Sequence, residues 1–229
     1  MLKLIRLEWK KNNIGKYIRN AAIMTLVLLF LILLMAGELD ADMSMEAYNG
    51  STVNTAVDLF AHMGYIVFTG VMIASFIVGA YEKRTINLMF SYPIKRQTIL
   101  LSKVLAIWIF NVIALTLSKI LIYAILFGTK SLTNISGSSI QFAMPSFWLK
   151  IVISSIAMVS VSFIALLIGL KMKSGKAAII TSVILVCVTQ GNVGDYTLAG
   201  NVPFYVLLFV LAVLSVFLSI YDVETKDVM

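Results

Sequence analysis

The chain alternates between long apolar runs and short segments that hold nearly all of its charged residues. The apolar runs cover approximately residues 21–36, 59–80, 104–127, 147–170, 177–190 and 205–220. About 20 apolar residues in a helix span the hydrocarbon core of a bilayer. The pattern therefore predicts an all-α integral membrane protein, with six transmembrane helices in a single domain over residues 1–229.

The fifth apolar run, 177–190, is the shortest, and its strictly apolar part is too short to cross a bilayer at 1.5 Å per residue. It leads into a segment rich in glycine, residues 189–203. Backbone of this kind is tolerated at membrane depth only where protein or water satisfies its hydrogen bonds. The sequence leaves open whether this segment re-enters the membrane or lies outside it.

Residues 1–20 combine two helical faces of different character. One face carries the apolar residues Leu2, Ile5 and Trp9, and the adjacent face carries the basic residues Lys3, Arg6 and Lys10. A helix of this type lies in the membrane interface with its apolar side buried among the headgroups. We therefore expect an interfacial amphipathic helix over residues 1–20, with Trp9 at headgroup depth.

Composition excludes a water-soluble domain, because 60% of the residues are hydrophobic and 13% are charged, whereas a soluble domain is about one quarter charged. The net charge of +7 does not indicate nucleic-acid binding, since the basic residues flank apolar runs. Cys187 is the only cysteine, so the chain forms no internal disulfide. These observations leave the lipid bilayer as the expected environment.

The positions of the basic residues predict the orientation. Fifteen of the 18 lysines and arginines fall in four segments, 1–20, 81–103, 171–176 and the C-terminal tail. The loop over residues 37–58 is acidic and holds no lysine or arginine. Because basic residues accumulate on the cytoplasmic side of a membrane, we expect a multi-pass protein of the plasma membrane with both termini in the cytoplasm.

The segment over residues 79–103 is a charged island between the second and third apolar runs, with the sequence GAYEKRTINLMFSYPIKRQTILLSK. Glu82 precedes Thr85 by three residues, Pro93 follows Thr85 by eight, and Lys103 follows Pro93 by ten. This spacing resembles the permease subunit of a type-2 ABC exporter, closest to the small six-span permeases of bacitracin and lantibiotic efflux and immunity systems. Arg84 stands where the family pattern has a glycine.

The resemblance implies that the loop after the second span forms a cytoplasmic coupling helix, which binds a separate ATPase. The residues assigned to this contact are Glu82, Lys83, Arg84, Thr85, Ile86, Asn87, Leu88, Met89, Phe90 and Pro93. The local sequence agrees, since Pro93 disfavours helix at the residue before it. The alternative is a positively charged loop that has no partner.

The resemblance further implies two permease subunits, identical or related, that move an amphipathic or antimicrobial peptide in a bacterial cell membrane. This chain would then be no enzyme and bind no cofactor or metal, and ATP and Mg would belong to the partner ATPase. The segment GLKMKSGKA at 169–177 agrees with this assignment, because its glycine spacing and the alanine after Lys176 do not match a phosphate-binding loop.

Three polar residues of the third apolar run are candidates for a translocation path: Asn111, Ser118 and Lys119. Ionisable residues inside membranes are functional candidates by default. The alternative for Lys119 is a side chain that extends to the outer interface. His62, the only histidine, lies one turn after Asp58 and is expected to be an ordinary polar residue at the interface.

Two other classes of function remain open. The same fold would serve a membrane sensor or an assembly factor that transports nothing. An intramembrane enzyme requires a convergent set of catalytic groups at membrane depth, and the apolar runs show almost no such set.

Overall fold

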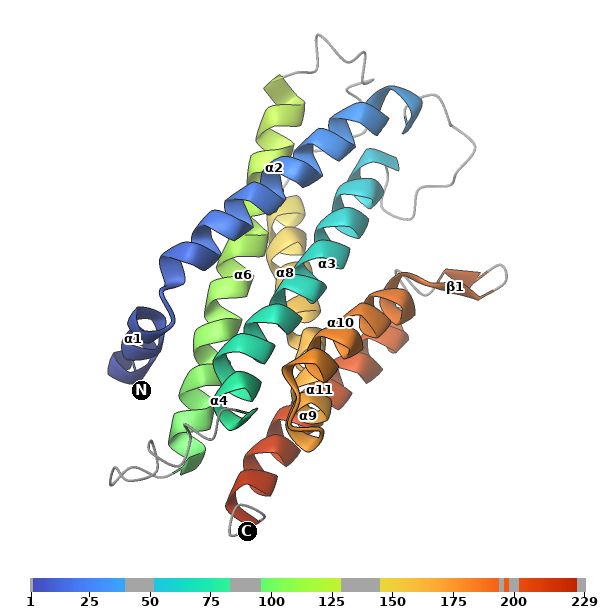
Figure 1. The fold of residues 1–229 in the computed structure, drawn as a ribbon. Helices are drawn as coiled ribbons and strands as arrows, with labels where there is room; N and C mark the ends of the chain where they lie inside the picture. The colour runs from blue at the N-terminus through green and yellow to red at the C-terminus, as the bar shows by residue number, and fades with distance from the viewer. Residues whose placement is uncertain are drawn as a thin grey trace. The chain divides into compact units, whose positions relative to one another are not determined.

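The computed structural model describes residues 2–39, 52–82, 96–128, 145–193, 196–197 and 202–225. The elements in chain order are α1 (Leu2–Lys11), α2 (Ile14–Leu39), α3 (Thr52–Ile73), the π-helix η1 (Ala74–Val78), α4 (Gly79–Glu82), α6 (Arg96–Gly128), α8 (Pro145–Ser162), α9 (Ile164–Lys171), α10 (Gly175–Gln190), β1 (Asn192–Val193), β2 (Tyr196–Thr197) and α11 (Val202–Thr225). Figure 1 shows these elements as a ribbon.

Within the described residues, five helical segments are long and apolar enough to cross a membrane: Ile14–Met35, Asn54–Tyr81, Gln97–Gly128, Ser146–Lys171 and Pro203–Tyr221. The prediction of a helical chain with several membrane-length apolar helices is therefore confirmed. The fifth predicted span, 177–190, corresponds to α10, which is apolar but only 16 residues long. After it, β1 and β2 form an antiparallel pair, Asn192 with Thr197 and Val193 with Tyr196.

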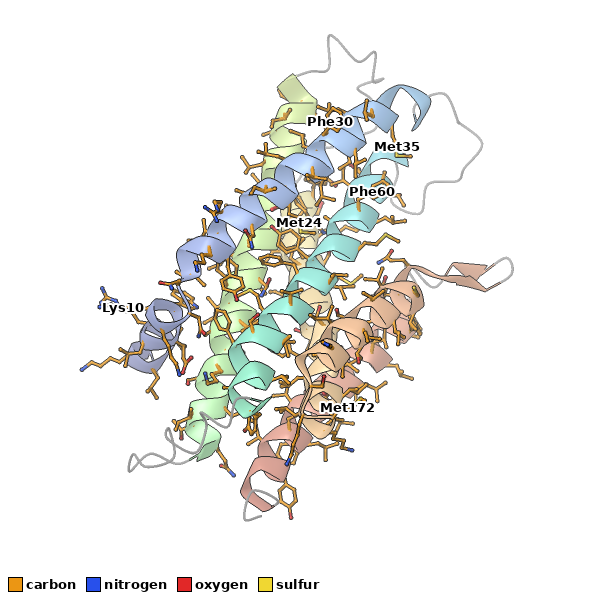
Figure 2. All side chains as sticks on the ribbon, viewed as in Figure 1. Lys10, Met24, Phe30, Met35, Phe60 and Met172 are labelled. Carbon is orange, nitrogen blue, oxygen red and sulfur yellow. The ribbon has the colours of Figure 1, made fainter. Side chains whose placement is uncertain are left out.

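The chain divides into two compact units. Unit 1 comprises Met1–Ile14, Tyr65–Asn111 and Ala157–Met229, and unit 2 comprises Gly15–Gly64 and Val112–Ile156. The core of unit 2 is built from large apolar side chains of α2, α3, α6 and α8, namely Leu28, Ile32, Val57, Ile122, Tyr123, Leu126 and Ile151. Met24 on α2 and Phe60 on α3, both labelled in Figure 2, pack against this core.

In unit 1, α9 packs against α10, α11 and η1. A small residue allows a close approach here, since a Cβ atom on Gly169 would lie 2.8 Å from Ala178 Cβ and 3.1 Å from Val78 Cγ2. Small residues at such positions let helices in membranes approach closely. The absence of a side chain at Gly169 therefore lets α9 pack closely against α10 and η1.

Large apolar side chains also cover exposed faces of α2 and α11. On α2, Phe30 is 62% exposed and Met35 is 39% exposed (Figure 2), and on α11 Phe217 is 66% exposed. A helix that is apolar all round belongs either in a protein core or in lipid. These faces are suited to lipid or to another membrane helix.

The N-terminal region differs from the single interfacial helix expected over residues 1–20. α1 ends at Lys11, and residues from Ile14 onward belong to the same helix as the first apolar run. The break lies at Asn13, whose φ of 51° is left-handed, a conformation that asparagine tolerates better than most residues. The side-chain amide of Asn12 donates to the carbonyl of Glu8 at 3.0 Å, which caps the end of α1.

Two charged residues that the sequence assigned to loops lie inside helices. α6 begins at Arg96, so Lys103 belongs to this helix rather than to the loop before it. α3 begins at Thr52, so Asp58 belongs to it rather than to the acidic loop. The spans predicted at 59–80 and 104–127 begin directly after Asp58 and Lys103, whereas a helix can extend through a charged residue that finds a partner.

Candidate functional site

The proposed ATPase contact falls almost wholly on residues 83–95, which lie outside the described residues. Glu82 is the last residue of α4, and α6 begins at Arg96. The structure therefore describes the two helices that border this segment. α4 and the part of α6 up to Asn111 belong to unit 1.

The first buried polar group near this segment is the Lys103 cluster, made of Glu8, Phe76 and Lys103. The Lys103 ammonium lies 2.8 Å from Glu8 Oε2 and 3.1 Å from the carbonyl oxygen of Phe76, and it donates to both. The side chains of Lys103 and Glu8 are 2% and 9% exposed. A buried charge pair of this type persists only with good geometry and additional hydrogen bonds.

The π-helix explains how a backbone carbonyl takes part in this cluster. In η1 the backbone widens, and Gly79 N–H donates to the carbonyl of Ala74, five residues earlier. π-Helical turns are rare and often occur at functional sites. Because Phe76 lies in the middle of this turn, its carbonyl is placed where Lys103 can donate to it.

Further contacts hold α1 on α6. The indole Nε1 of Trp9 donates to the carbonyl of Ala106 at 3.1 Å, and Ile5 is 6% exposed. The N–H of Trp9 thus binds the α6 backbone, and the expected position of Trp9 at headgroup depth stays a prediction. The exposed face of α1 carries the basic residues Lys3, Arg6 and Lys10, the last labelled in Figure 2. The first turns of α6 are thus fixed to both α1 and η1.

Unit 2 contains a second buried polar group, the Lys119 cluster, made of Asp58 and His62 on α3, Lys119 on α6 and Ser154 on α8. The Lys119 ammonium lies 2.7 Å from Asp58 Oδ1, 2.9 Å from His62 Nε2 and 2.9 Å from Ser154 Oγ. Ser154 Oγ is also 3.1 Å from His62 Nε2. Three helices therefore meet at one ammonium group.

Burial corrects two sequence interpretations. The side chain of Lys119 is 0% exposed, so it does not extend to the interface as one alternative proposed. His62 is 7% exposed and hydrogen-bonded, so it is not an ordinary interfacial residue. The side chain of Asp58 is 24% exposed, which is the largest exposed fraction of the three ionisable groups.

The three contacts of Lys119 determine the protonation of its neighbours. An ammonium has three donors and no acceptor, so His62 Nε2 must accept, and in the neutral ring the proton then lies on Nδ1. Asp58 balances the charge of Lys119 at 2.7 Å. The cluster is therefore electrically neutral with a deprotonated Asp58, a charged Lys119 and an uncharged His62.

A serine hydroxyl beside an imidazole nitrogen is also the arrangement of serine hydrolases. In those enzymes the lone pair of the nitrogen must be available to take the hydroxyl proton. Here Lys119 donates to both His62 Nε2 and Ser154 Oγ. The lone pair that a general base needs is occupied, so the geometry favours a structural role for this set.

The other two candidates for a translocation path have separate partners. Asn111, in unit 1, donates to the carbonyl of Ile107 and to the sulfur of Met72, and its Oδ1 has no hydrogen-bond partner. In unit 2, the hydroxyl of Ser118 lies 2.6 Å from that of Thr25 on α2. Asn111, Ser118 and Lys119 therefore belong to three different hydrogen-bonded groups, and a shared path through them stays a prediction.

No three histidine, cysteine, aspartate or glutamate side chains in the described parts of the chain are grouped so that they could hold a metal ion. The residue that sequence reasoning missed is Glu8. Its signal was present, since it is the only acid in residues 1–20 and lies three residues after Ile5, on the face that packs inward. The spacing of Asp58 and His62, four residues apart on α3, likewise places them on one helix face.

The sequence of this chain is similar to that of a curated protein over nearly its whole length. The chain is 25% identical over 227 residues to "Uncharacterized protein YcbO" of Bacillus subtilis (strain 168), covering 99% of this chain and 100% of that protein. No protein-family model matches the chain, and no solved structure matches it. The function is therefore inferred from the residues themselves.

Proposed function

We propose that this chain is the membrane permease subunit of an ATP-driven exporter of the type-2 ABC class. The observation that carries the proposal is the Lys103 cluster. Lys103 closes the charged pattern that begins at Glu82, and its ammonium binds Glu8 and the carbonyl of Phe76. Lys103 therefore ties α6, the helix after the proposed docking segment, to η1 before that segment and to α1.

The described helices suit the transmission of force. α4 leads into residues 83–95 from η1, and α6 leads out of them. The Lys103 cluster joins α6 to η1, and Trp9 joins α6 to α1. A displacement of residues 83–95 by a bound ATPase would therefore move α1, η1 and the start of α6 together, as packed elements do in hinge and shear motions.

The proposed assembly has two permease subunits and two ATPase subunits in a bacterial cell membrane, with both termini of this chain in the cytoplasm. ATP binding would close the ATPase dimer, displace the coupling segments and shift the paired helices between inward-open and outward-open arrangements. The exposed apolar faces of α2 and α11 would contact lipid or the second permease. The cargo class is an amphipathic peptide, and nucleotide and Mg²⁺ would bind only to the ATPase.

Association with an ATPase tests the docking role of residues 84–90. The full-length chain, expressed in its native membrane and extracted gently, is expected to co-purify with a soluble ATPase. Replacing residues 84–90 with glycine and serine removes the side chains that would enter the ATPase groove, and is expected to reduce the recovered ATPase at least tenfold. The measurement is the ratio of ATPase to permease in the purified complex.

A matched control replaces seven residues of another polar segment, 132–138, with the same glycine and serine sequence. This control is expected to keep the ATPase bound. Equal recovery of ATPase from all three proteins would remove the docking hypothesis, provided that each protein is present in the membrane in similar amounts.

A further inference from the structure

We propose that His62 is a proton-binding site in unit 2, and that a proton on its imidazole breaks the contact with Lys119 and separates α3 from α6. This inference rests on the Lys119 cluster alone and is independent of the proposed transport function. The ligand is the proton, and the site is formed by Asp58, His62, Lys119 and Ser154.

The contact between His62 and Lys119 exists in only one charge state. Lys119 Nζ lies 2.9 Å from His62 Nε2, and the ammonium can only donate. A protonated imidazole has no acceptor nitrogen, so the hydrogen bond would be replaced by two positive charges at contact distance. Because Lys119 is 0% exposed, water does not screen this repulsion from the lysine side.

Within the cluster, His62 can take up a proton between pH 5 and 8 only when its contact with Lys119 opens, because burial and the charge of Lys119 disfavour imidazolium in the closed arrangement. On its own helix Asp58 lies one turn earlier, and its charge is matched by Lys119. On α6 the only other titratable side chain nearby is Tyr123, one turn after Lys119, and a phenol does not titrate between pH 5 and 8. α8 contributes Ser154, and α2 contributes apolar Met24 and Leu28 at the neighbouring Gly64. Imidazole is the side chain that ordinarily changes charge in this range.

Burial indicates where the proton enters. Asp58 is 24% exposed, whereas Lys119 is 0% exposed and His62 is 7% exposed. The cluster is therefore most exposed beside Asp58, the seventh residue of α3. The charge pattern of the sequence assigns this end of α3 to the outside of the cell, so the site would respond to external acid.

The single histidine of the chain makes a direct test feasible, because labelling histidine with ¹⁵N gives the ring signals of His62 alone. The full-length protein in lipid nanodiscs is expected to show a neutral ring at pH 7.5, with the proton on Nδ1 and an unprotonated Nε2. As the pH is lowered, imidazolium is expected to form only together with loss of the contact to Lys119. A ring protonated on Nε2 at pH 7.5, or imidazolium that forms while this contact persists, would overturn the proposal.

Hydrogen exchange in the same nanodiscs tests whether protonation opens the helices. After correction for the intrinsic pH dependence of exchange, peptides from residues 54–64 and 112–123 are expected to exchange about tenfold faster at pH 5.0 than at pH 7.5. His62→Gln retains an acceptor for Lys119 but does not titrate, so its exchange should be independent of pH after the same correction. Faster exchange at pH 5.0 in His62→Gln, or equal exchange at the two pH values in the wild-type protein, would overturn the coupling.

Discussion

Asp58→Leu is expected to lower the free energy of unfolding by about 3–5 kcal/mol, the range measured when one member of a buried ion pair is removed. The variant leaves the ammonium of Lys119 without its counter-charge, and that ammonium is 0% exposed. Hydrogen bonds to His62 and Ser154 cannot replace a negative charge. The measurement is reversible unfolding of the full-length protein in mixed micelles.

The converse variant and the double variant make this prediction specific. Lys119→Met is expected to cost less, near the lower end of the range, because the Asp58 carboxylate is 24% exposed and can regain water. Asp58→Leu with Lys119→Met leaves no unpaired charge and is expected to lie nearer the wild-type value than either single variant. Additive costs in the double variant would show that the ion pair does not couple α3 to α6.

Lys103→Met is expected to release α1 from α6. Glu8, 9% exposed, loses its counter-charge at 2.8 Å and keeps only the amide of Asn12 at 3.3 Å, and Phe76 loses a donor to its carbonyl. A loss of about 3 kcal/mol in the docking of α1 corresponds to an increase of about a hundredfold in its opening equilibrium. Hydrogen exchange of residues 2–11 in nanodiscs measures this increase directly.

Two controls accompany the measurement on α1. Lys10→Met removes an exposed lysine of the same helix and is expected to leave its exchange unchanged. Glu8→Gln combined with Lys103→Met removes both charges and is expected to recover most of the protection. Equal protection in Lys103→Met and the wild-type protein would mean that Trp9 and Ile5 alone hold α1 in place.

The apolar runs predict the helical character of the chain because hydrophobicity is a local property of the sequence. Each run of about 20 apolar residues corresponds to a helix of membrane length among the described residues, and the shortest run corresponds to α10. Helix ends were less predictable. The sequence places the third span at 104–127, whereas α6 begins at Arg96, because nothing in residues 96–103 breaks a helix.

The buried clusters could not be predicted from local sequence. Lys119 is separated from Asp58 by 61 residues, and Lys103 from Glu8 by 95 residues. The segment around Lys119 is mostly apolar, so the sequence does not indicate which face of α6 turns toward the other helices. A lysine near the end of a span usually indicates the cytoplasmic side of the membrane. Here the charge of Lys103 is instead balanced by Glu8 inside the protein.

The sequence likewise does not predict the π-helix η1. Residues 74–78 have an ordinary apolar helical composition, without proline and with glycine only afterwards, at Gly79. The wider turn is visible only in the backbone hydrogen bond from Gly79 to Ala74. Its position opposite Lys103 suggests that tertiary contact, rather than local propensity, stabilises it.

The most direct test of the proposed function is peptide movement in liposomes that contain this chain and the ATPase that co-purifies with it. A fluorescent amphipathic peptide is expected to change its distribution across the membrane when ATP and Mg²⁺ are supplied, and to stay in place with a nonhydrolysable ATP analogue. Replacing residues 84–90 with glycine and serine is expected to abolish the movement. Peptide binding without any ATP-dependent movement would contradict an exporter and favour a membrane sensor.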